Sequence, residues 1–372
     1  MAGRGERSAT PEAGAAGGVA QPAASDRPDA SAAWRAEVQR RLLGWFQQHR
    51  RPLPFRSGRT PYRVLVAEFM LQQTRAEAVG PFFERFVRRF PDVPALAAAA
   101  DDEVLAVWQG LGYYRRARLL RAAAAEMQAR HGGAVPSDPA ALRALPGVGP
   151  YIAAAVGAFA FGRDEAACDA NVRRVLARLC DAPRPDAALA ARLLPVGRGP
   201  EWNEALMDFG SAVCIPRTPR CAACPLSDVC AGRRAGRAAL LPERPPRRPR
   251  PEVVVTVLVA RDAQGRFGLV RRPATGLLGG LWELPAAEGA LDPGEVARRH
   301  ALRLTAAAVP LAAFRHVFTH RAWTVRPFAA SAAADGPEPS AVRWVAAEAL
   351  AGVPLGGPSA RLVAGALRPS AK

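Results

Sequence analysis

An arginine- and proline-rich stretch divides this chain into two parts with different sequence patterns. It covers residues 232–251 and reads GRRAGRAALLPERPPRRPRP. Proline lacks a backbone N–H and interrupts helices and sheets, so a stretch of this kind does not form a regular core element. We therefore expect a linker at 232–251 that joins two domains, which a chain of 372 residues is long enough to form.

The part before the linker has helical periodicity. Apolar side chains recur at helical spacing at Val104, Val107, Trp108 and Leu111, and again at Val172, Val175, Leu176 and Leu179. Residues 1–31 consist mainly of Ala, Gly, Pro and charged residues, with no apolar segment of a secretory signal. We expect a disordered tail over 1–31 and an all-α domain over 32–231.

The part after the linker has strand patterns. β-branched residues dominate EVVVTVLVA at 252–260, Gly265 marks a turn, and FGLVRR at 267–272 is the expected hairpin partner. FRHVFTHRAWTVRPF and AVRWV add further strand-like segments. The prediction is an α+β domain over 252–368. No apolar run approaches the roughly 20 residues that cross a bilayer.

The chain carries a formal charge of +18, and arginine supplies nearly all of the positive charge because Lys372 is the only lysine. Such a charge favours a polyanionic partner, nucleic acid before a membrane surface. Alanine and arginine are both enriched, as in proteins of GC-rich genomes, so the choice of arginine over lysine carries little functional information.

A single carboxylate lies within the apolar segment VLVAEFMLQQT, residues 64–74. Glu68 either points to solvent from one face of a helix or lies in a dry pocket where it keeps its proton. Desolvation disfavours the charged form of a carboxyl group and raises its pKa. The second alternative would supply a general acid near neutral pH.

Four cysteines are spaced C-x6-C-x2-C-x5-C: Cys214, Cys221, Cys224 and Cys230. Four thiolates this close can surround one metal centre. A zinc ribbon usually has two C-x2-C pairs and this segment has one, so the spacing favours an iron–sulfur cluster over zinc. Cys168 and Cys180 lie outside this group, and we expect them in a hydrophobic core.

A tight turn precedes a small-residue helix in LPGVGPYIAAAVGAF, residues 145–159. The turn contains Gly147 and Gly149, and it directs unpaired backbone N–H groups outward at a helix N-terminus, which suits an anion. The same pattern also occurs in ordinary connections between helices. With the charge of the chain, it favours a helix–hairpin–helix at about 140–162 that grips a DNA phosphate.

A second acid, Asp169, comes just before an amphipathic helix in CDANVRRVLARL. Aspartate is a preferred helix cap, and capping alone accounts for this position. Capping and catalysis are compatible, however. A capping carboxylate is rigid and stays ionised, which suits a group that faces a developing cation.

Six motifs follow one another in the order VAEFMLQQT, WQGLGYYRRARLL, LPGVGPY, CDANVRRVLARL, WNEALMDFGSAVC and the cysteine loop at 214–230. This order resembles the helix–hairpin–helix, endonuclease III-like DNA glycosylases with a [4Fe–4S] cluster, and among them the adenine DNA glycosylases with a Nudix-like C-terminal domain. The resemblance covers about residues 34–365. It implies base-excision repair of adenine mispaired with 8-oxoguanine or guanine in double-stranded DNA, after the base is flipped out of the stack. It also implies a [4Fe–4S] cluster on the four cysteines and a monomeric protein of the bacterial cytoplasm and nucleoid.

The resemblance assigns roles to five residues of the catalytic pocket. Glu68 matches the general acid that protonates adenine at N7. Asp169 matches the carboxylate that stabilises the oxocarbenium-like sugar, an arrangement of two carboxyl groups in opposed environments. Tyr151 and Asn171 match residues that order this site through hydrogen bonds, and Glu204 matches a residue that reads the adenine edge.

Gln73 and Tyr113 match side chains that enter the duplex beside the lesion. If one helix runs from Glu68 to Gln73, five positions turn the side-chain direction by about 140°, so that one residue faces the pocket and the other faces DNA. The alternative is that Tyr113 is an aromatic residue of the hydrophobic core, but the surrounding GLGYYRRAR favours contact with DNA.

The C-terminal part resembles a Nudix-like domain through GLLGGLWELP, residues 276–285. The family's sensor of 8-oxoguanine is usually Phe-Ser-His, and Phe318, Thr319 and His320 stand in its place, with a hydroxyl kept and a methyl group added. No R-E-x-x-E-E pattern follows, because the corresponding segment reads DPGEVARRHALRL. Hydrolysis of nucleotides needs those carboxylates for its metal ions, so we expect a domain that binds without hydrolysing.

Related enzymes that also cut the DNA strand use a lysine amine as their nucleophile. Tyr151 occupies the matching position and no lysine precedes Lys372, so we expect a monofunctional glycosylase. The alternatives are a thymine or uracil mismatch glycosylase, a non-catalytic iron–sulfur DNA-binding protein, and a Nudix hydrolase with a helical appendage. Glu204 and the C-terminal domain count against the first, the pair Glu68 and Asp169 against the second, and the missing carboxylates against the third.

Overall fold

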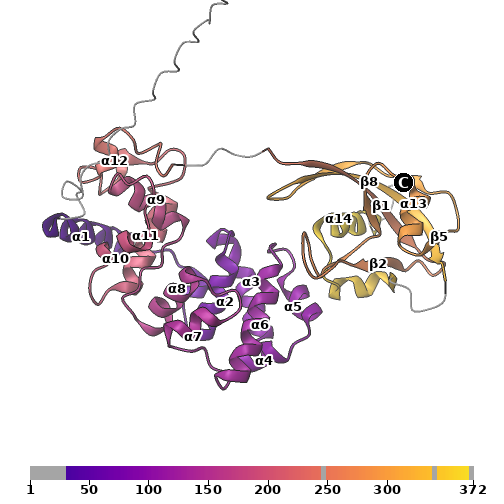
Figure 1. The fold of residues 1–372 in the computed structure, drawn as a ribbon, viewed down its shortest axis with the longest axis horizontal. Coiled ribbons are helices and arrows are strands. Elements are labelled where there is room, and N and C mark those ends of the chain that lie inside the picture. Colours follow the sequence, from indigo (N-terminus) through magenta and orange to yellow (C-terminus); the bar gives the residue numbers. More distant parts are fainter. Residues whose placement is uncertain (1–30, 244–248, 337–341, 368–372) are drawn as a thin grey trace, which may run out of the picture.

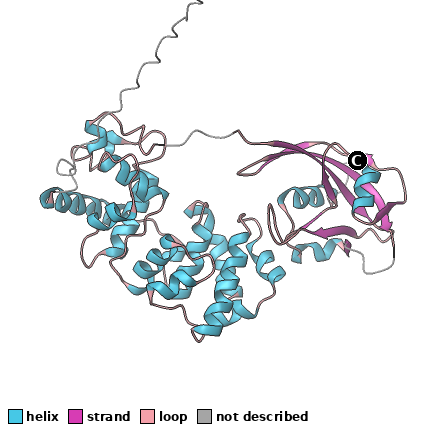
Figure 2. Cartoon of the chain, viewed as in Figure 1, coloured by secondary structure: helices cyan, strands magenta, loops and turns pink. Residues whose placement is uncertain are grey.

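The structure of the protein, a computed structural model, describes residues 31–243, 249–336 and 342–367 (Figure 1). A helical part is followed by a part built on a β-sheet, as Figure 2 shows, so the predicted order of an all-α and an α+β architecture is confirmed. The tail expected over 1–31 lies outside the described residues, except for Ser31, whose side chain caps the first helix.

The helical part packs around two hydrophobic cores, one among α2–α8 and one among α1, α9, α10 and α11. The predicted apolar stripe on α9 is confirmed, since its four residues are buried; on α5, Val104 and Trp108 are buried but Val107 is half-buried. No helix of the described residues is both long and apolar enough to cross a membrane. The helices are α1 (Ala32–His49), η3 (Pro54–Arg56), α2 (Pro61–Leu71), α3 (Ala76–Arg89), α4 (Val93–Ala98), α5 (Asp101–Trp108), α6 (Arg115–Arg130), α7 (Pro139–Ala144), α8 (Pro150–Phe161), α9 (Ala170–Leu179), α10 (Ala187–Leu193), α11 (Gly199–Ala212), η4 (Cys221–Ala223) and α12 (Ala231–Arg234).

The predicted helix–hairpin–helix is present as α7, a turn and α8. Gly147 has a φ of +79°, and a Cβ there would lie 2.9 Å from Phe69 and from Leu119. Only glycine tolerates both the left-handed backbone and this close approach. The hairpin therefore packs directly against α2, beside Glu68.

The C-terminal part is a nine-stranded sheet with the order β3-β2-β1-β8-β5, in which β4 also pairs with β1, β6 and β7 with β8, and β9 with β2. The long strands β1 and β8 are parallel, and β1 pairs with β2 as the predicted antiparallel hairpin. Two apolar clusters account for its core. The elements are β1 (Glu252–Arg261), β2 (Phe267–Arg271), β3 (Trp282–Glu283), β4 (Ala286–Glu288), α13 (Pro293–Arg299), β5 (Leu302–Leu304), β6 (Val309–Pro310), β7 (Phe314–Val317), β8 (Ala322–Ala334), β9 (Val342–Val345), η5 (Ala347–Gly352) and α14 (Gly357–Ala366).

Candidate active site and DNA-facing residues

A cleft of about 1110 Å³ opens among α2, α8, α9 and α11. Its volume slightly exceeds the range of roughly 300–1,000 Å³ for small-molecule sites, so a nucleoside can enter it. The hairpin glycines Gly147 and Gly149 do not line it. Six of the predicted site residues do: Glu68, Gln73, Tyr151, Asp169, Asn171 and Glu204.

Glu68 lies in the apolar interior at the edge of this cleft, which excludes the solvent-facing alternative. It is on α2, which begins at Pro61 after the cap Thr60, and its side chain is buried. Burial raises its pKa to about 7, although the hydrogen bond that Tyr151 donates to Oε2 over 2.9 Å works in the opposite direction. The negative charge of Asp169 raises the pKa further. A carboxyl group with this pKa still carries its proton in about half of the molecules at neutral pH.

Asp169 caps α9 as predicted and lines the same cleft. Its Oδ1 accepts a hydrogen bond from the backbone N–H of Val172 over 2.7 Å, and its Oδ2 accepts one from Asn171 Nδ2 over 2.9 Å. Burial raises the pKa of Asp169 above its ordinary value, although these donors work in the opposite direction. The cleft therefore holds two carboxyl groups. Glu68 accepts a hydrogen bond from a tyrosine hydroxyl, and Asp169 accepts hydrogen bonds from a backbone amide and a side-chain amide.

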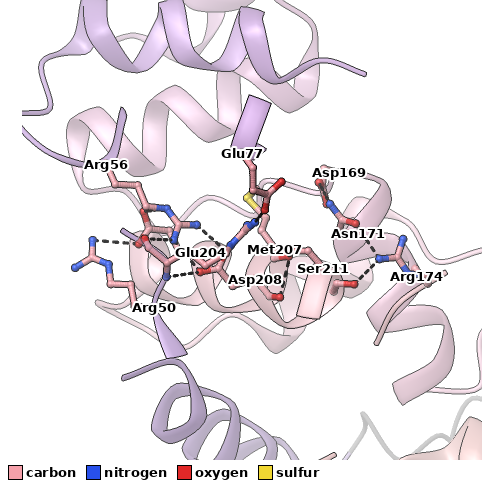
Figure 3. Close-up of polar contacts among 12 residues, drawn as sticks. Arg50, Arg56, Glu77, Asp169, Asn171, Arg174, Glu204, Met207, Asp208 and Ser211 are labelled. Atoms are coloured by element: carbon pink, nitrogen blue, oxygen red, sulfur yellow. Dashed lines mark hydrogen bonds and ion pairs between the residues drawn. The ribbon is translucent and has the colours of Figure 1, made fainter. Parts of the chain in front are cut away.

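A hydrogen-bond chain leads from Asp169 to the cysteine loop, and Figure 3 shows its part from Asp169 to Arg174. Asn171 donates to Asp169, and Arg174 Nη2 donates to Asn171 Oδ1 over 2.8 Å. The same guanidinium donates through Nε to the carbonyl of Cys214 over 2.8 Å. Gly210 permits this packing, because a Cβ there would lie 2.8 Å from Asn171.

Arginines surround the two acids of WNEALMD, Glu204 and Asp208 (Figure 3). Glu204 is buried and forms ion pairs with Arg59, Arg50 and Arg56. Its carboxylate is thus already bound by protein groups in this structure.

Asp208 lies one turn after Glu204 on α11 and is fully buried. It accepts hydrogen bonds from Arg56 over 2.7 and 2.9 Å and from Arg51 Nε over 2.7 Å. Burial opposes its ionisation, but the two arginines hold its pKa below the usual range. Sequence reasoning missed Asp208 and its arginines; the signal was an acid four positions after Glu204, on the same helix face.

Gln73 does not continue the helix of Glu68, so the expected separation of about 140° around one axis is wrong. Helix α2 ends at Leu71 with Gln72 as its cap, and Gln73 has a φ of +56°. Gln73 reaches the exposed mouth of the cleft through this turn. A tight backbone turn, rather than helical spacing, separates it from Glu68.

Tyr113 also has a left-handed backbone, with a φ of +48°, and its side chain is exposed, which excludes the core alternative. The buried Arg116 ties its turn to the end of α2. It donates to the carbonyl of Met70 over 2.7 Å and to that of Gly112 over 3.0 Å. One guanidinium therefore ties together the backbone turns that carry Gln73 and Tyr113, the two residues predicted to enter DNA.

Phe318, Thr319 and His320 form the turn between β7 and β8. Phe318 packs between His316 and Trp323, with ring centroids 4.5 and 5.0 Å away, whereas Thr319 and His320 are exposed. The Thr319 hydroxyl lies 2.6 Å from that of Tyr113, 206 positions away in the chain. The structure thus brings the predicted C-terminal sensor to the predicted intercalating residue.

The four predicted metal ligands line one cavity next to α9 and α11. Arg178 donates to Cys214 Sγ over 3.4 Å, and Leu226 and Phe209 are among the apolar residues around the cavity. Nowhere in the described ranges do three or more His, Cys, Asp or Glu side chains converge as around a single metal ion. Cys168 and Cys180 are buried in the second helical core, as predicted.

Comparisons with known proteins agree with both parts of the chain. Residues 66–195 match the family described as HhH-GPD superfamily base excision DNA repair protein, and residues 256–365 match the NUDIX domain. An adenine DNA glycosylase of Mycobacterium tuberculosis is 45% identical over 205 residues, which are 52% of this chain and 67% of that protein. The adenine DNA glycosylase of Mus musculus is 32% identical over 378 residues, which are 82% of this chain and 73% of that protein. Among solved structures, a thermostable thymine-DNA glycosylase is similar with a TM-score of 0.52 and 30% identity, covering 54% of this chain and 97% of that one.

Proposed function

The chain belongs to the adenine DNA glycosylases of base-excision repair, and we propose that its substrates are duplexes in which adenine faces 8-oxoguanine or guanine. The observation that carries the proposal is the buried Glu68, with a pKa of about 7, in one cleft with the capped Asp169. A neutral acid and a stabilised carboxylate are the two groups that cleavage of a glycosidic bond requires.

In the proposed reaction, adenine leaves the DNA stack and enters the cleft. Glu68 gives its proton to N7, the bond between C1′ and N9 breaks, and the bonding electrons leave with the base. Asp169 stabilises the positive charge that develops on the sugar, and Asn171 holds its carboxylate in place. Water then adds to C1′, and the proton that it releases restores Glu68. Tyr151 orients Glu68 through its hydroxyl.

The arginines around Glu204 support a role for this residue beyond direct contact with adenine. Because Arg59 lines the cleft and pairs with Glu204, we propose that Glu204 presents this guanidinium to the base edge. Arg56, anchored on Asp208, completes the same wall.

The opposite base is the proposed ligand of the C-terminal domain. Thr319 and His320 are exposed beside Tyr113, which suits contact with a base that stays in the duplex while adenine is flipped. In this proposal the catalytic domain covers 32–231 and the lesion-sensing domain 252–368, joined by 232–251. This connection is not as irregular as expected, because it begins within α12 and its Leu241 is buried, with a carbonyl that accepts a hydrogen bond from Arg178 Nε over 2.9 Å. Gly147 and Gly149, in the turn of the hairpin, contact the phosphate backbone of DNA in this proposal.

The proposed cofactor is a [4Fe–4S] cluster on Cys214, Cys221, Cys224 and Cys230, in a protein that acts as a monomer. Four thiols around one apolar cavity fit this group. Held by these four cysteines, the cluster would fix the loop that follows α11, which the Asn171–Arg174 chain connects to the cleft.

The absence of any lysine before Lys372 supports a hydrolytic, monofunctional enzyme. Single-turnover assays on adenine opposite 8-oxoguanine, guanine, thymine and cytosine, each with and without alkali, test both parts of the proposal. Strand breaks for the first two duplexes only after alkali are the expected result. Breaks without alkali would disprove the monofunctional assignment.

The structural similarity to a thymine-DNA glycosylase supports a second candidate function, that of a thymine or uracil mismatch glycosylase. Duplexes with thymine or uracil opposite guanine belong in the same assay. Product from these and none from adenine duplexes would favour this second candidate. The Glu68→Gln variant should bind adenine mispairs and excise nothing.

A further inference from the structure

Asp102 connects the helical part to the sheet part of the chain. It lies in the first turn of α5, and its two carboxylate oxygens are used by different partners. Arg271 Nη2 donates to Oδ1 over 2.7 Å, and Trp282 Nε1 donates to Oδ2 over 3.3 Å. Figure 1 shows α5 on the side of the helical part that faces β2. One acid of the helical part thus binds two donors of the C-terminal domain.

The two donors are arranged for a carboxylate by the sheet itself. Arg271 is on β2 and Trp282 on β3, and they are direct partners in the antiparallel register. The guanidinium carbons of Arg271 and Arg343 lie 5.7 and 5.3 Å from the Trp282 ring. The guanidinium groups of Arg271 and Arg343 make the surroundings of the Trp282 ring strongly positive, and Asp102 supplies the complementary negative charge.

Apolar and backbone contacts continue the same interface. Leu281 is fully buried within the first helical core, and Leu278 packs against it. Arg118 of α6 donates to the carbonyl of Ala274, and it lies so close to Gly280 that a Cβ there would be 2.8 Å from Nη1. The segment 274–282 therefore seats the C-terminal domain on α5 and α6.

This seating determines where the exposed turn at Thr319 lies relative to Tyr113. The hydroxyl oxygens of Thr319 and Tyr113 are 2.6 Å apart, although the two residues are 206 positions apart in the chain. Asp102 and Tyr113 are both in the helical part, on α5 and in the turn that follows it. Asp102 does not line the cleft, so it has no contact with the adenine site.

We propose that Asp102 is a positioning residue for the preference between bases opposite adenine. By binding Arg271 and Trp282, it keeps Thr319 beside Tyr113, where both can act on 8-oxoguanine. This inference rests on the proposed function, in which the C-terminal turn senses that base. The consequence is that loss of Asp102 weakens discrimination and leaves the chemistry of excision intact.

The test compares Asp102→Ala and Trp282→Phe with the wild type and with Asp101→Ala. Asp101 is a matched control, because it is the neighbouring acid on α5 but pairs with Arg121 inside the helical part at 2.9 Å. In single-turnover assays at subsaturating enzyme, the first two variants should lose about five- to tenfold in the rate for adenine opposite 8-oxoguanine, the scale of a modest coupling between sites. Their rates opposite guanine should stay within about twofold of wild type, and the control should retain both rates.

Hydrogen exchange over residues 274–282 gives a second measurement that does not depend on 8-oxoguanine. Faster exchange in Asp102→Ala than in the control is expected. Unchanged exchange and an unchanged rate ratio would overturn the inference. An equal loss of rate on both duplexes would overturn it too, since it would indicate a general loss of stability. A wild type without preference for 8-oxoguanine would instead refute the proposed sensing of that base by the C-terminal turn, and the exchange data would still decide whether Asp102 seats the domain.

Discussion

Replacing Glu68 with glutamine tests whether the fold holds this side chain as a neutral acid. Burial is the main reason that its pKa rises to about 7, and the charge of Asp169 adds to it. Glutamine has nearly the same size and can accept the hydrogen bond from Tyr151, but it has no charge to desolvate. We expect Glu68→Gln to lose excision and, at alkaline pH, to be more stable than the wild type.

The magnitude follows from the displacement of the Glu68 pKa. A carboxyl group whose pKa is higher in the folded than in the unfolded chain stabilises the fold while protonated, and this contribution is lost as the pH rises. The stabilisation by protonated Glu68 is lost over the pH range from its ordinary pKa of 4.5 to its raised pKa of about 7. With about 1.4 kcal/mol per pKa unit, ionisation costs the wild type about 3 kcal/mol at pH 8 but about 1 kcal/mol at pH 5. The variant avoids this cost at both values of pH.

Thermal unfolding of the two full-length proteins, followed by circular dichroism at pH 5 and pH 8, measures the difference. A gain of about 3 kcal/mol corresponds to a Tm increase of roughly 6–12 °C for a domain of this size. The increase should be full at pH 8 and fall to about a third of that value at pH 5. A variant whose Tm differs from wild type equally at both values would refute a buried neutral acid, as would a destabilised variant at pH 8.

Three further predictions concern the surroundings of the cleft. Tyr151→Phe removes a hydrogen bond that lowers the Glu68 pKa, so the alkaline limb of excision, near pH 7 in the wild type, should move to higher pH in rate profiles; a shift to lower pH would contradict this role. Asp208→Ala removes the fully buried acid that Arg51 and Arg56 share, leaves Arg51 with Glu77 and Arg56 with Glu204, and should cost about 3–5 kcal/mol in unfolding free energy, against under about 1 kcal/mol for the exposed pair removed by Glu77→Gln. Thr319→Val should reduce the preference for 8-oxoguanine while Thr319→Ser keeps it, and equal preferences in competition assays would show that the hydroxyl is not used.

Local features of the site were predictable from the sequence because they depend on neighbours within a few positions. Asp169 caps α9 through the amide of Val172, three residues on, as its place before an amphipathic run predicts. Gly147 takes the left-handed backbone that a tight hairpin needs. The helical prediction for Gln73 failed at the end of α2, where one residue with positive φ turns the chain. A helix end of this kind has no strong local signal when neither glycine nor proline marks it.

The sequence by itself determined the two architectures, the acid within an apolar helix and the grouping of four cysteines, since periodicity and spacing act along the chain. Only the tertiary structure decided the partners of the charged groups. Arg56 and Asp208 meet across 152 positions, and Tyr113 and Thr319 across 206. Many arginines are available to each acid, and their charges alone do not distinguish them. Burial selects the pairs, because a desolvated carboxylate is tolerated only where the packed helices bring a guanidinium within hydrogen-bond distance.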